Sequence, residues 1–199
     1  MNIIDLGKLI DPEEFTSCIE VAEGLETIIH KYGGNTVIPD YPCWIEYKNE
    51  GGIIGSLSFS RHTNKHPILS EMSKKVTDIL RPIFPKEYGP EIGRIHLIRT
   101  KGDIPIHRDE GGRLTCINIG LKNSSEAITY MGATDVPRED FYKTRSTTIL
   151  KDGYGYLVNT HEWHSVQAIN DKPRYLITYS LGAKFDYFKK FLRMEKQSC

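Results

Sequence analysis

The chain has 199 residues and a mass of 22.7 kDa, which fits a single domain with its own buried core. Apolar residues make up 39% of it and charged residues 26%, a balance that excludes a wholly disordered chain. The 26 lysines and arginines equal the 26 aspartates and glutamates, so the chain has no bulk attraction for phosphate backbones or anionic membranes. We therefore expect neither a nucleic acid nor a membrane as a partner.

The four cysteines show no paired C-x-x-C spacing: Cys18, Cys43, Cys116 and Cys199. This distribution predicts free thiols in a reducing compartment, rather than a disulfide framework or a structural zinc site. The N-terminus lacks a basic stretch followed by an apolar one, and no apolar run approaches the ~20 residues that span a bilayer. A cytoplasmic location is the expectation that follows.

A first helix is predicted near the N-terminus. It begins after Asp11, an N-cap residue with Pro12 at the first helical position. Its apolar residues recur at steps of three and four as far as Ile29, and Gly33 and Gly34 end the pattern. This apolar stripe is expected to face the core.

A turn, a strand and a second helix follow. Residues 49–52, Asn-Glu-Gly-Gly, are typical of a turn, and residues 53–60 of a strand. From Pro67, apolar residues again recur on one helical face until Pro82 interrupts the helix.

From Ile92 onward the pattern changes to short apolar or alternating runs separated by turn residues. The runs that predict strands are Arg94–Arg99, Leu114–Leu121, Ala127–Met131, Thr147–Leu150, Tyr154–Val158, Ser165–Ile169 and Tyr175–Leu181. Many short strands with regular turns favour an all-β sandwich or barrel, with the preceding helices packed on one face. We expect one domain over residues 1–199, made of a helical part (1–90), a β core (91–182) and a short amphipathic helix (183–199).

A pair of metal-ligand side chains occurs at His107 and Asp109. On a strand, residues i and i+2 point to the same side, so the imidazole and the carboxylate can chelate one metal ion. Alone, such a pair is more typical of a surface turn, here beside Gly111 and Gly112.

His164 supplies a second histidine, and Arg174 follows ten residues later. Two histidines and one carboxylate form the facial triad of non-haem Fe(II) oxygenases, which leaves three adjacent coordination positions open. Two of these can take a bidentate 2-oxo acid and the third can take O₂. The planar fork of an arginine suits the distal carboxylate of 2-oxoglutarate, because it donates two parallel hydrogen bonds.

The region 92–181 resembles the Fe(II)/2-oxoglutarate-dependent dioxygenases. It is most similar to the branch of aspartyl/asparaginyl β-hydroxylases and bacterial cis-proline hydroxylases. The motifs that carry the resemblance are Arg94-Ile-His-Leu-Ile-Arg-Thr-Lys-Gly102, the pair His107-x-Asp109, Arg113-Leu-Thr-Cys-Ile-Asn-Ile-Gly-Leu121, Trp163-His164-Ser165-Val166 and Arg174. The resemblance implies a mainly β (α+β) fold, with a double-stranded β-helix (jelly-roll) core and the N-terminal helices on one face.

The resemblance also implies a reaction. His107, Asp109 and His164 would be the catalytic metal ligands for Fe(II), and Arg174 would anchor 2-oxoglutarate as the cosubstrate. With O₂, such an enzyme hydroxylates an unactivated C–H bond and releases succinate and CO₂. The branch points to an amino acid, free or peptidyl, as the substrate, while the oligomeric state is left open.

Two further residues, His96 and Asn118, are expected to contact the cosubstrate by the same resemblance. They lie eleven residues before and after His107, and both are polar on otherwise apolar strands. A hydrogen-bonded core histidine is an equally good interpretation of His96. An arginine that helps hold the cosubstrate in some relatives aligns with Cys116 here, and strand parity argues against Arg113 as its substitute.

Several alternatives remain at this point. His161 competes with His164 as the distal ligand, but only His164 has the ten-residue spacing to Arg174. The whole chain is also compatible with a cupin-like metal enzyme that does not use 2-oxoglutarate, and with a non-catalytic jelly-roll binding module. Arg174 argues against the first, and binding of Fe(II) discriminates the second. A halogenase of this fold is disfavoured, because such enzymes have a small residue at the position of Asp109.

Residues 164 and 174 are predicted not to share a hairpin. A hairpin turning at residues 170–173 would separate His164 from Arg174 by five residues along the ladder, or roughly 16 Å. That distance is too long for one iron-bound 2-oxoglutarate to reach both. We expect the chain to cross to the opposite sheet before Arg174, and Pro173 fits this crossing because it lacks a ladder donor.

Overall fold

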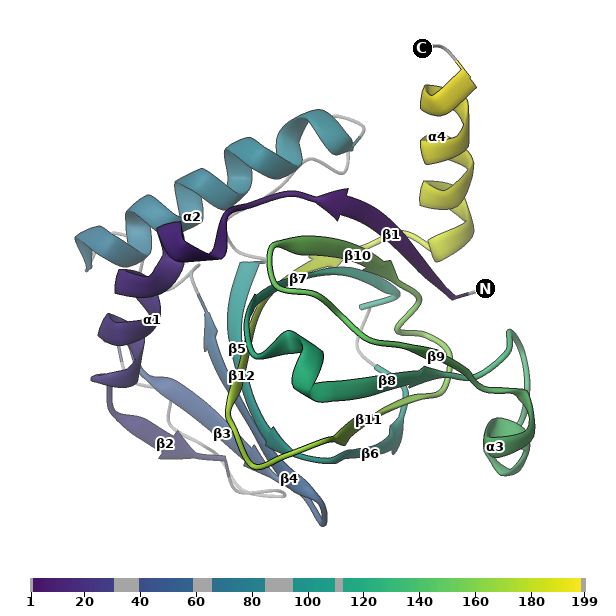
Figure 1. The fold of residues 1–199 in the computed structure, drawn as a ribbon, viewed down its shortest axis with the longest axis horizontal. Helices are drawn as coiled ribbons and strands as arrows, with labels where there is room; N and C mark the ends of the chain where they lie inside the picture. The colour runs from purple at the N-terminus through teal and green to yellow at the C-terminus, as the bar shows by residue number, and fades with distance from the viewer. Residues whose placement is uncertain (1, 31–39, 59–65, 85–94, 110–112, 198–199) are drawn as a thin grey trace.

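A computed structural model of the chain describes residues 2–30, 40–58, 66–84, 95–109 and 113–197. Two sheets face each other across a central space (Figure 1). The larger sheet contains, in spatial order, β1 (Ile3–Lys8), β10 (Tyr154–Val158), β7 (Thr115–Lys122), β12 (Arg174–Leu181), β5 (Ile95–Gly102), β4 (Gly52–Ser58), β3 (Trp44–Lys48) and β2 (Thr27–Ile29). The smaller sheet contains β6 (Ile104–His107), β11 (His164–Ala168), β8 (Ala127–Met131) and β9 (Ser146–Thr148). The predicted jelly-roll core is confirmed.

The helices lie outside this pair of sheets. Figure 1 shows α1 (Thr16–Glu23) and α2 (Pro67–Leu80) over the outer face of the larger sheet. The short α3 (Phe141–Thr144) lies in the connection from β8 to β9, and α4 (Phe185–Gln197) follows β12. Single 3-10 turns occupy Pro12–Phe15, Arg81–Ile83, Ser124–Glu126 and Arg138–Asp140. None of the described helices combines the length and the apolar composition needed to cross a bilayer.

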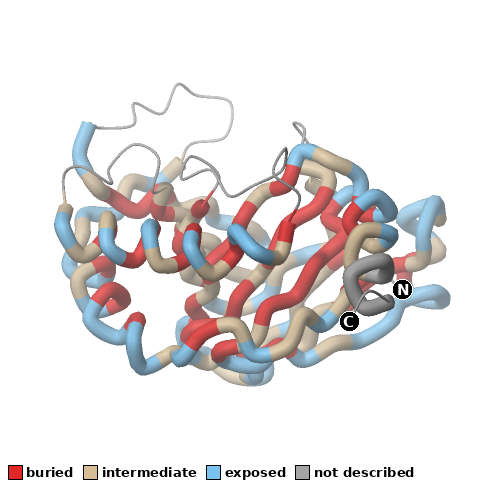
Figure 2. The backbone as a smooth tube through the Cα atoms, turned by 90° about the horizontal axis from the view of Figure 1, so that it is seen from above, coloured by how far each residue is buried: buried red, intermediate tan, exposed pale blue. Residues whose placement is uncertain are grey.

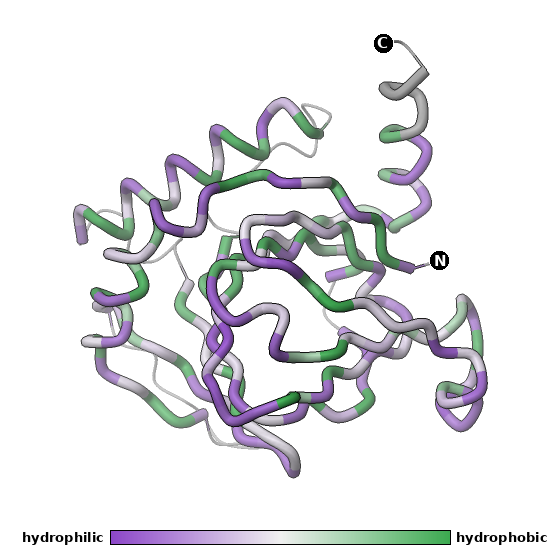
Figure 3. The backbone as a smooth tube through the Cα atoms, viewed as in Figure 1, coloured by the Kyte–Doolittle hydropathy of each residue, from purple (hydrophilic) through white to green (hydrophobic). Residues whose placement is uncertain are grey.

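Alternation along the strands divides the interior into an apolar core and a cavity between the two sheets. On β12, Tyr175, Ile177 and Tyr179 are buried in the core beneath the helices. The intervening residues face the other sheet, because successive side chains of a strand point to opposite sides. These are Arg174, Leu176 and Thr178. Buried segments run along the strands beneath the helices (Figure 2), and hydrophobic and hydrophilic segments alternate along them (Figure 3).

The first helix is shorter than the apolar spacing predicts. Asp11 caps the 3-10 turn that leads into α1, its side chain accepting a hydrogen bond from the backbone N–H of Glu13. The helix ends at Glu23, and Ile29, the last residue of the predicted apolar stripe, lies in β2, which pairs in parallel with β3. A short apolar run is compatible with either structure, and pairing with another strand decided between them. Gly33 and Gly34, predicted to end the helix, lie outside the described residues.

The N-terminal part of the chain is less helical than expected. It supplies four strands of the larger sheet, β1 to β4, of which only β4 was predicted. The turn expected at residues 49–52 joins β3 to β4, and the side chain of Asn49 accepts hydrogen bonds from the amides of Gly51 and Gly52. The second helix begins at Pro67, as predicted.

The predicted crossing between residues 164 and 174 is confirmed. Strand β11 pairs with β6 and β8 in the smaller sheet, whereas β12 pairs with β5 and β7 in the larger one. His164 and Arg174 therefore stand on facing walls. The predicted free thiols are also confirmed for Cys18, Cys43 and Cys116, while Cys199 lies outside the described residues.

Gly102 occupies a corner that no other residue type fits. Its φ is +75°, and a Cβ atom there would lie 2.5 Å from the carbonyl oxygen of Gly51. The tip of the β3–β4 hairpin thus packs directly on the corner between β5 and β6. This packing places the carbonyl of Gly102, which accepts a 2.6 Å hydrogen bond from Arg174 Nη2.

Gly102→Ala is expected to lower the free energy of unfolding by about 2 kcal/mol or more. A left-handed backbone costs a non-glycine residue about 1–3 kcal/mol, and the clash with Gly51 adds to this cost. Urea denaturation measures the effect. Gly24→Ala is the matched control, because Gly24 has a helical φ of −78° and no atom closer than 3.5 Å to the added Cβ. Equal losses in the two variants would contradict the argument.

Candidate metal centre and its cavity

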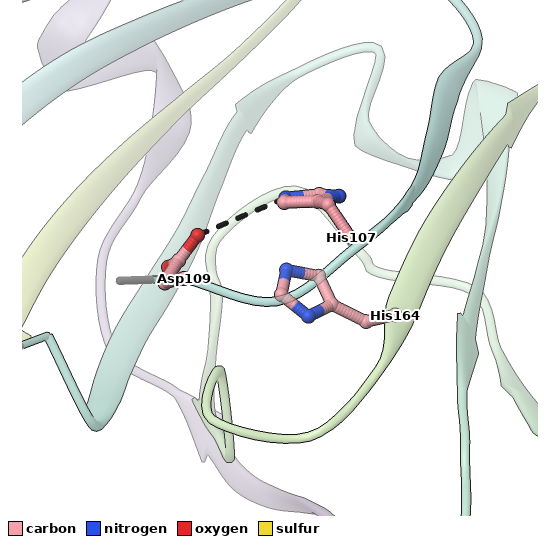
Figure 4. A group of neighbouring side chains, drawn as sticks. All are labelled: His107, Asp109 and His164. Carbon is pink, nitrogen blue, oxygen red and sulfur yellow. Dashed lines mark ion pairs between the residues drawn. The ribbon is translucent and has the colours of Figure 1, made fainter. Parts of the chain in front are cut away.

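Two histidines and one aspartate converge at one end of the smaller sheet. His107 ends β6, Asp109 follows two residues later, and His164 begins β11. Because β6 and β11 pair with His107 opposite His164, the two rings lie 4.1 Å apart between centroids. One ligand atom from each of the three residues lies within 4.8 Å of the others (Figure 4). The geometry brings together the three residues predicted as metal ligands, and His161 is exposed instead.

Each histidine is held by a backbone carbonyl two residues earlier in the chain. His107 Nδ1 lies 2.9 Å from the oxygen of Pro105, and His164 Nδ1 lies 2.8 Å from that of Glu162. A carbonyl oxygen only accepts, so Nδ1 carries the proton and donates it in both rings. The Nε2 lone pairs are therefore left for a metal ion, as in metal sites generally.

Asp109 is oriented by three contacts. Its backbone N–H donates to the carbonyl of Thr160 at 2.9 Å. Carboxylate atom Oδ1 is 3.7 Å from His107 Nε2, while Oδ2 is 3.1 Å from Arg113 Nε. One oxygen thus faces the histidines and the other faces the arginine.

The buried position of His164 keeps it neutral. Only 9% of its surface is exposed, and burial lowers its pKa well below the ordinary value, with the neighbouring His107 adding to the effect. Neutral imidazole is the form that binds a metal. The site therefore presents His164 in its ligand form at neutral pH.

A cavity of about 190 Å³ opens from this metal centre into the space between the two sheets. Its lining combines aliphatic side chains from both walls with a few polar groups. Among the described residues that line it, Asp109 is the only acid, whereas Arg113 and Arg174 are both cationic. The cavity therefore carries excess positive charge and suits an anion.

Arg174 lines this cavity with only 3% of its surface exposed. Its Nη2 donates to Gly102, but its Nε has no hydrogen-bond partner in the part of the chain that the structure describes. The hydroxyl of Ser124, which also lines the cavity, is buried and equally unpartnered there. Burial lowers the pKa of Arg174, because it disfavours the charged form. These two donors thus lack an acceptor, whereas Arg113 Nε, which also makes no hydrogen bond, lies 3.1 Å from Asp109 Oδ2.

The other two residues predicted to contact the cosubstrate, Asn118 and His96, differ in whether they line the cavity. Asn118 lines the cavity, and its side-chain oxygen accepts a short hydrogen bond from the hydroxyl of Thr178. His96 stands beside Thr178 in the sheet but pairs with the hydroxyl of Ser56 at 3.1 Å, and it is not among the residues that line the cavity.

Several polar residues that line the cavity were not singled out from the sequence, among them Thr178 and Ser124. Thr178 and Ser124 carried no motif, although Thr178 shares the strand face of Arg174. Arg113, which precedes β7, was considered only as a substitute cosubstrate contact, and its ion pair with Asp109 was not predicted. Its position four residues after Asp109 was the available signal.

The free energy of unfolding of the metal-free protein is expected to fall as the pH decreases below about 6.5, the ordinary histidine pKa. The unfolded chain then takes up a proton at residue 164 that the folded chain, with its lowered pKa, does not. The slope that one such proton adds is about 1.4 kcal/mol per pH unit. Urea titrations at several pH values measure it. The slope should decrease in His164→Asn and not in His161→Asn; an unchanged slope in His164→Asn would contradict the assignment.

No protein-family model matches the sequence, and no curated protein matches it. Several solved structures, in contrast, superpose on the fold of this chain. A 2OG-Fe(II) oxygenase family oxidoreductase from Burkholderia pseudomallei superposes with a TM-score of 0.59 at 11% identity, over 91% of this chain and 85% of the other. HygX from Streptomyces hygroscopicus, solved with nickel and 2-oxoglutarate, gives 0.56 at 10% identity over 92% and 84%. The epimerase SnoN from nogalamycin biosynthesis gives 0.53 at 10% over 89% and 76%. The chain therefore has the jelly-roll fold of Fe(II)/2-oxoglutarate-dependent oxygenases.

Proposed function

We propose that the protein is an Fe(II)- and 2-oxoglutarate-dependent oxygenase that hydroxylates an unactivated C–H bond. The observation that carries the proposal is the convergence of His107, Asp109, His164 and Arg174 on one cavity from two facing sheets. A metal-binding end and a cationic end are the two features that 2-oxoglutarate requires, because it chelates through one end and carries a carboxylate at the other.

The donor set fits Fe(II). Two neutral imidazoles and one carboxylate form the triad that leaves coordination positions open for a 2-oxo acid and O₂. His107 and His164 would bind through Nε2, since Nδ1 of each is engaged by a carbonyl. Asp109 would bind through Oδ1, which faces His107.

The opposite end of the cavity fits the distal carboxylate of 2-oxoglutarate. The unpartnered Nε of Arg174 and hydroxyl of Ser124 would gain an acceptor there. Between the two ends, aliphatic side chains would cover the methylene carbons of the cosubstrate; they include Ile98, Ile104, Val166 and Leu176. A cupin-like enzyme without 2-oxoglutarate has no use for a buried arginine at this position.

When bound, Fe(II) and 2-oxoglutarate supply the oxidising chemistry: 2-oxoglutarate, O₂ and a substrate C–H bond become succinate, CO₂ and a C–OH bond. The chain itself contributes three things. It holds the ligand nitrogens and oxygen in place, it pairs Arg174 with the distal carboxylate, and it excludes water by its aliphatic walls.

We infer that the substrate is an amino acid, either a free small molecule or a residue within a peptide. Structures of the same fold contain hygromycin B in HygX and nogalamycin RO in SnoN, which supports a small-molecule substrate in general. The amino-acid class rests on the resemblance of residues 92–181 to the β-hydroxylase and cis-proline hydroxylase branch. A coupled succinate assay over free amino acids and model peptides tests it, and uniformly uncoupled turnover would argue against it.

The double variant His107→Ala, Asp109→Ala is expected to lose Fe(II)-dependent formation of succinate from 2-oxoglutarate, because only His164 of the triad remains. Succinate release under O₂ with Fe(II) and ascorbate measures this. His161→Ala, which removes an exposed histidine nearby, is the control and should retain turnover. Unchanged succinate formation in the double variant would refute the triad. A wild-type protein that binds no Fe(II) would favour a non-catalytic module.

Arg174→Met is expected to raise the KM for 2-oxoglutarate by roughly 10–100-fold while leaving metal affinity unchanged. A hydrogen bond to a charged group contributes about 1.5–3 kcal/mol, and the variant removes the donor from the distal carboxylate. Arg174→Lys keeps the charge but loses the planar fork, so an intermediate KM is expected. Initial rates at varied 2-oxoglutarate concentrations measure both. An unchanged KM in Arg174→Met would show that the anchor lies elsewhere.

A further inference from the structure

We propose that Arg113 is a positioning residue for Asp109, which it restricts to binding the metal through a single oxygen. The inference rests on the proposed metal site. Arg113 lies four residues after Asp109 and just before β7, and it lines the same cavity. The proposed function assigns the cosubstrate to Arg174, and it gives Arg113 no role.

The contacts of Arg113 connect the two sheets at the level of the metal centre. Its Nε lies 3.1 Å from Asp109 Oδ2, an ion pair that does not have hydrogen-bond geometry, and its Nη2 donates to the hydroxyl of Thr178 at 3.0 Å. That hydroxyl in turn donates to the side-chain oxygen of Asn118. The guanidinium is thereby fixed between Asp109 on one side and a polar pair of the larger sheet on the other. A fixed cation can hold a carboxylate in one orientation, whereas a freely moving one cannot.

The charges around Arg113 leave it one ionic partner. Its side chain is partly buried, and Asp109 is the only acidic residue among the described residues that line the cavity. The other titratable side chains close enough to interact with it electrostatically are two histidines and a thiol: His96, His164 and Cys116. A cation in this position depends on a paired anion, because an unpaired charge is costly to remove from water. The structure thus couples Arg113 to Oδ2 of Asp109.

This coupling has a consequence for coordination. A carboxylate can bind a metal through one oxygen or through both. With both, it would occupy one of the three positions that the triad must leave open for a 2-oxo acid and O₂. Arg113 engages Oδ2, so only Oδ1 remains to bind beside His107. Arg113 therefore preserves the open position.

Arg113 and Arg174 do not duplicate each other. Thr178, the hydroxyl partner of Arg113, lies four residues beyond Arg174 on β12, or about 13 Å along the strand. Arg174 is held instead by the carbonyl of Gly102 at the far corner of the cavity. One arginine serves the metal end and the other serves the distal end.

Titration of the metal-free protein with Co(II) alone tests the proposal, with the visible absorption of the bound ion as the readout of coordination. Arg113→Met should weaken Co(II) binding by roughly 10–100-fold, the usual effect of removing a residue that orients a ligand. It should also change the absorption spectrum, because Oδ2 becomes free to bind. Arg113→Lys should recover part of the affinity. Thr178→Val, which removes only the support of the guanidinium, should give a smaller loss.

Arg81→Met is the matched control, because Arg81 also pairs with an aspartate, Asp78, but on the exposed surface of the second helix. It should bind Co(II) like the wild type. Thermal denaturation of each metal-free variant identifies any that fails to fold, and Thr178→Val then carries the test in place of Arg113→Met.

The outcomes of these titrations distinguish a failure of this proposal from a failure of the proposed function. Wild-type affinity and spectrum in folded Arg113→Met would overturn the positioning role while leaving the oxygenase assignment intact. An unchanged Co(II) affinity combined with a raised KM for 2-oxoglutarate would overturn it too, and would make Arg113 a cosubstrate contact. A wild-type protein that binds no Co(II) would overturn both proposals. Weakened Co(II) binding supports the positioning role even if no substrate is found.

Discussion

The antiparallel pairing of β6 with β11 is the contact on which the candidate site depends. It sets His107 directly opposite His164, although the two residues are far apart in the chain. In each histidine, Nδ1 donates a hydrogen bond to the carbonyl oxygen two residues earlier in the chain. These bonds orient both rings so that Nε2 is left for the metal. A ladder register is a discrete quantity, and a slip by one residue would turn one ring to the opposite face of the sheet.

The cavity is the second consequence of strand geometry. The same alternation that buries Tyr175, Ile177 and Tyr179 beneath the helices turns Arg174 and Thr178 toward the smaller sheet. The helices on the outer face therefore stabilise the wall that carries the cationic end of the site. The β3–β4 hairpin adds to this wall, because its glycines let the backbone approach the corner at Gly102, whose carbonyl holds Arg174.

The two ends of the cavity differ in how their charges are balanced. One aspartate and two arginines face a space lined largely by aliphatic side chains, where unpaired charges are costly. Arg113 is balanced by Asp109, whereas Arg174 is left with a neutral carbonyl and an open donor. This asymmetry distinguishes a structural ion pair at the metal end from a binding group that awaits an anion at the other.

The sequence by itself determined the local features: the Asp11 cap before the first helix, the helix beginning at Pro67, the succession of short strands after residue 92, and the His-x-Asp pair with its distant histidine and arginine. These follow from residue spacing, which short-range geometry translates directly into structure. Only the tertiary structure decided where the first helix ended, because Thr27–Ile29 became a strand once β3 offered it a partner. It also decided that Arg113 and Ser124 reach the cavity while His96 turns to Ser56. Such outcomes depend on which distant backbone or side chain completes a hydrogen bond or an ion pair, and that information is absent from local patterns.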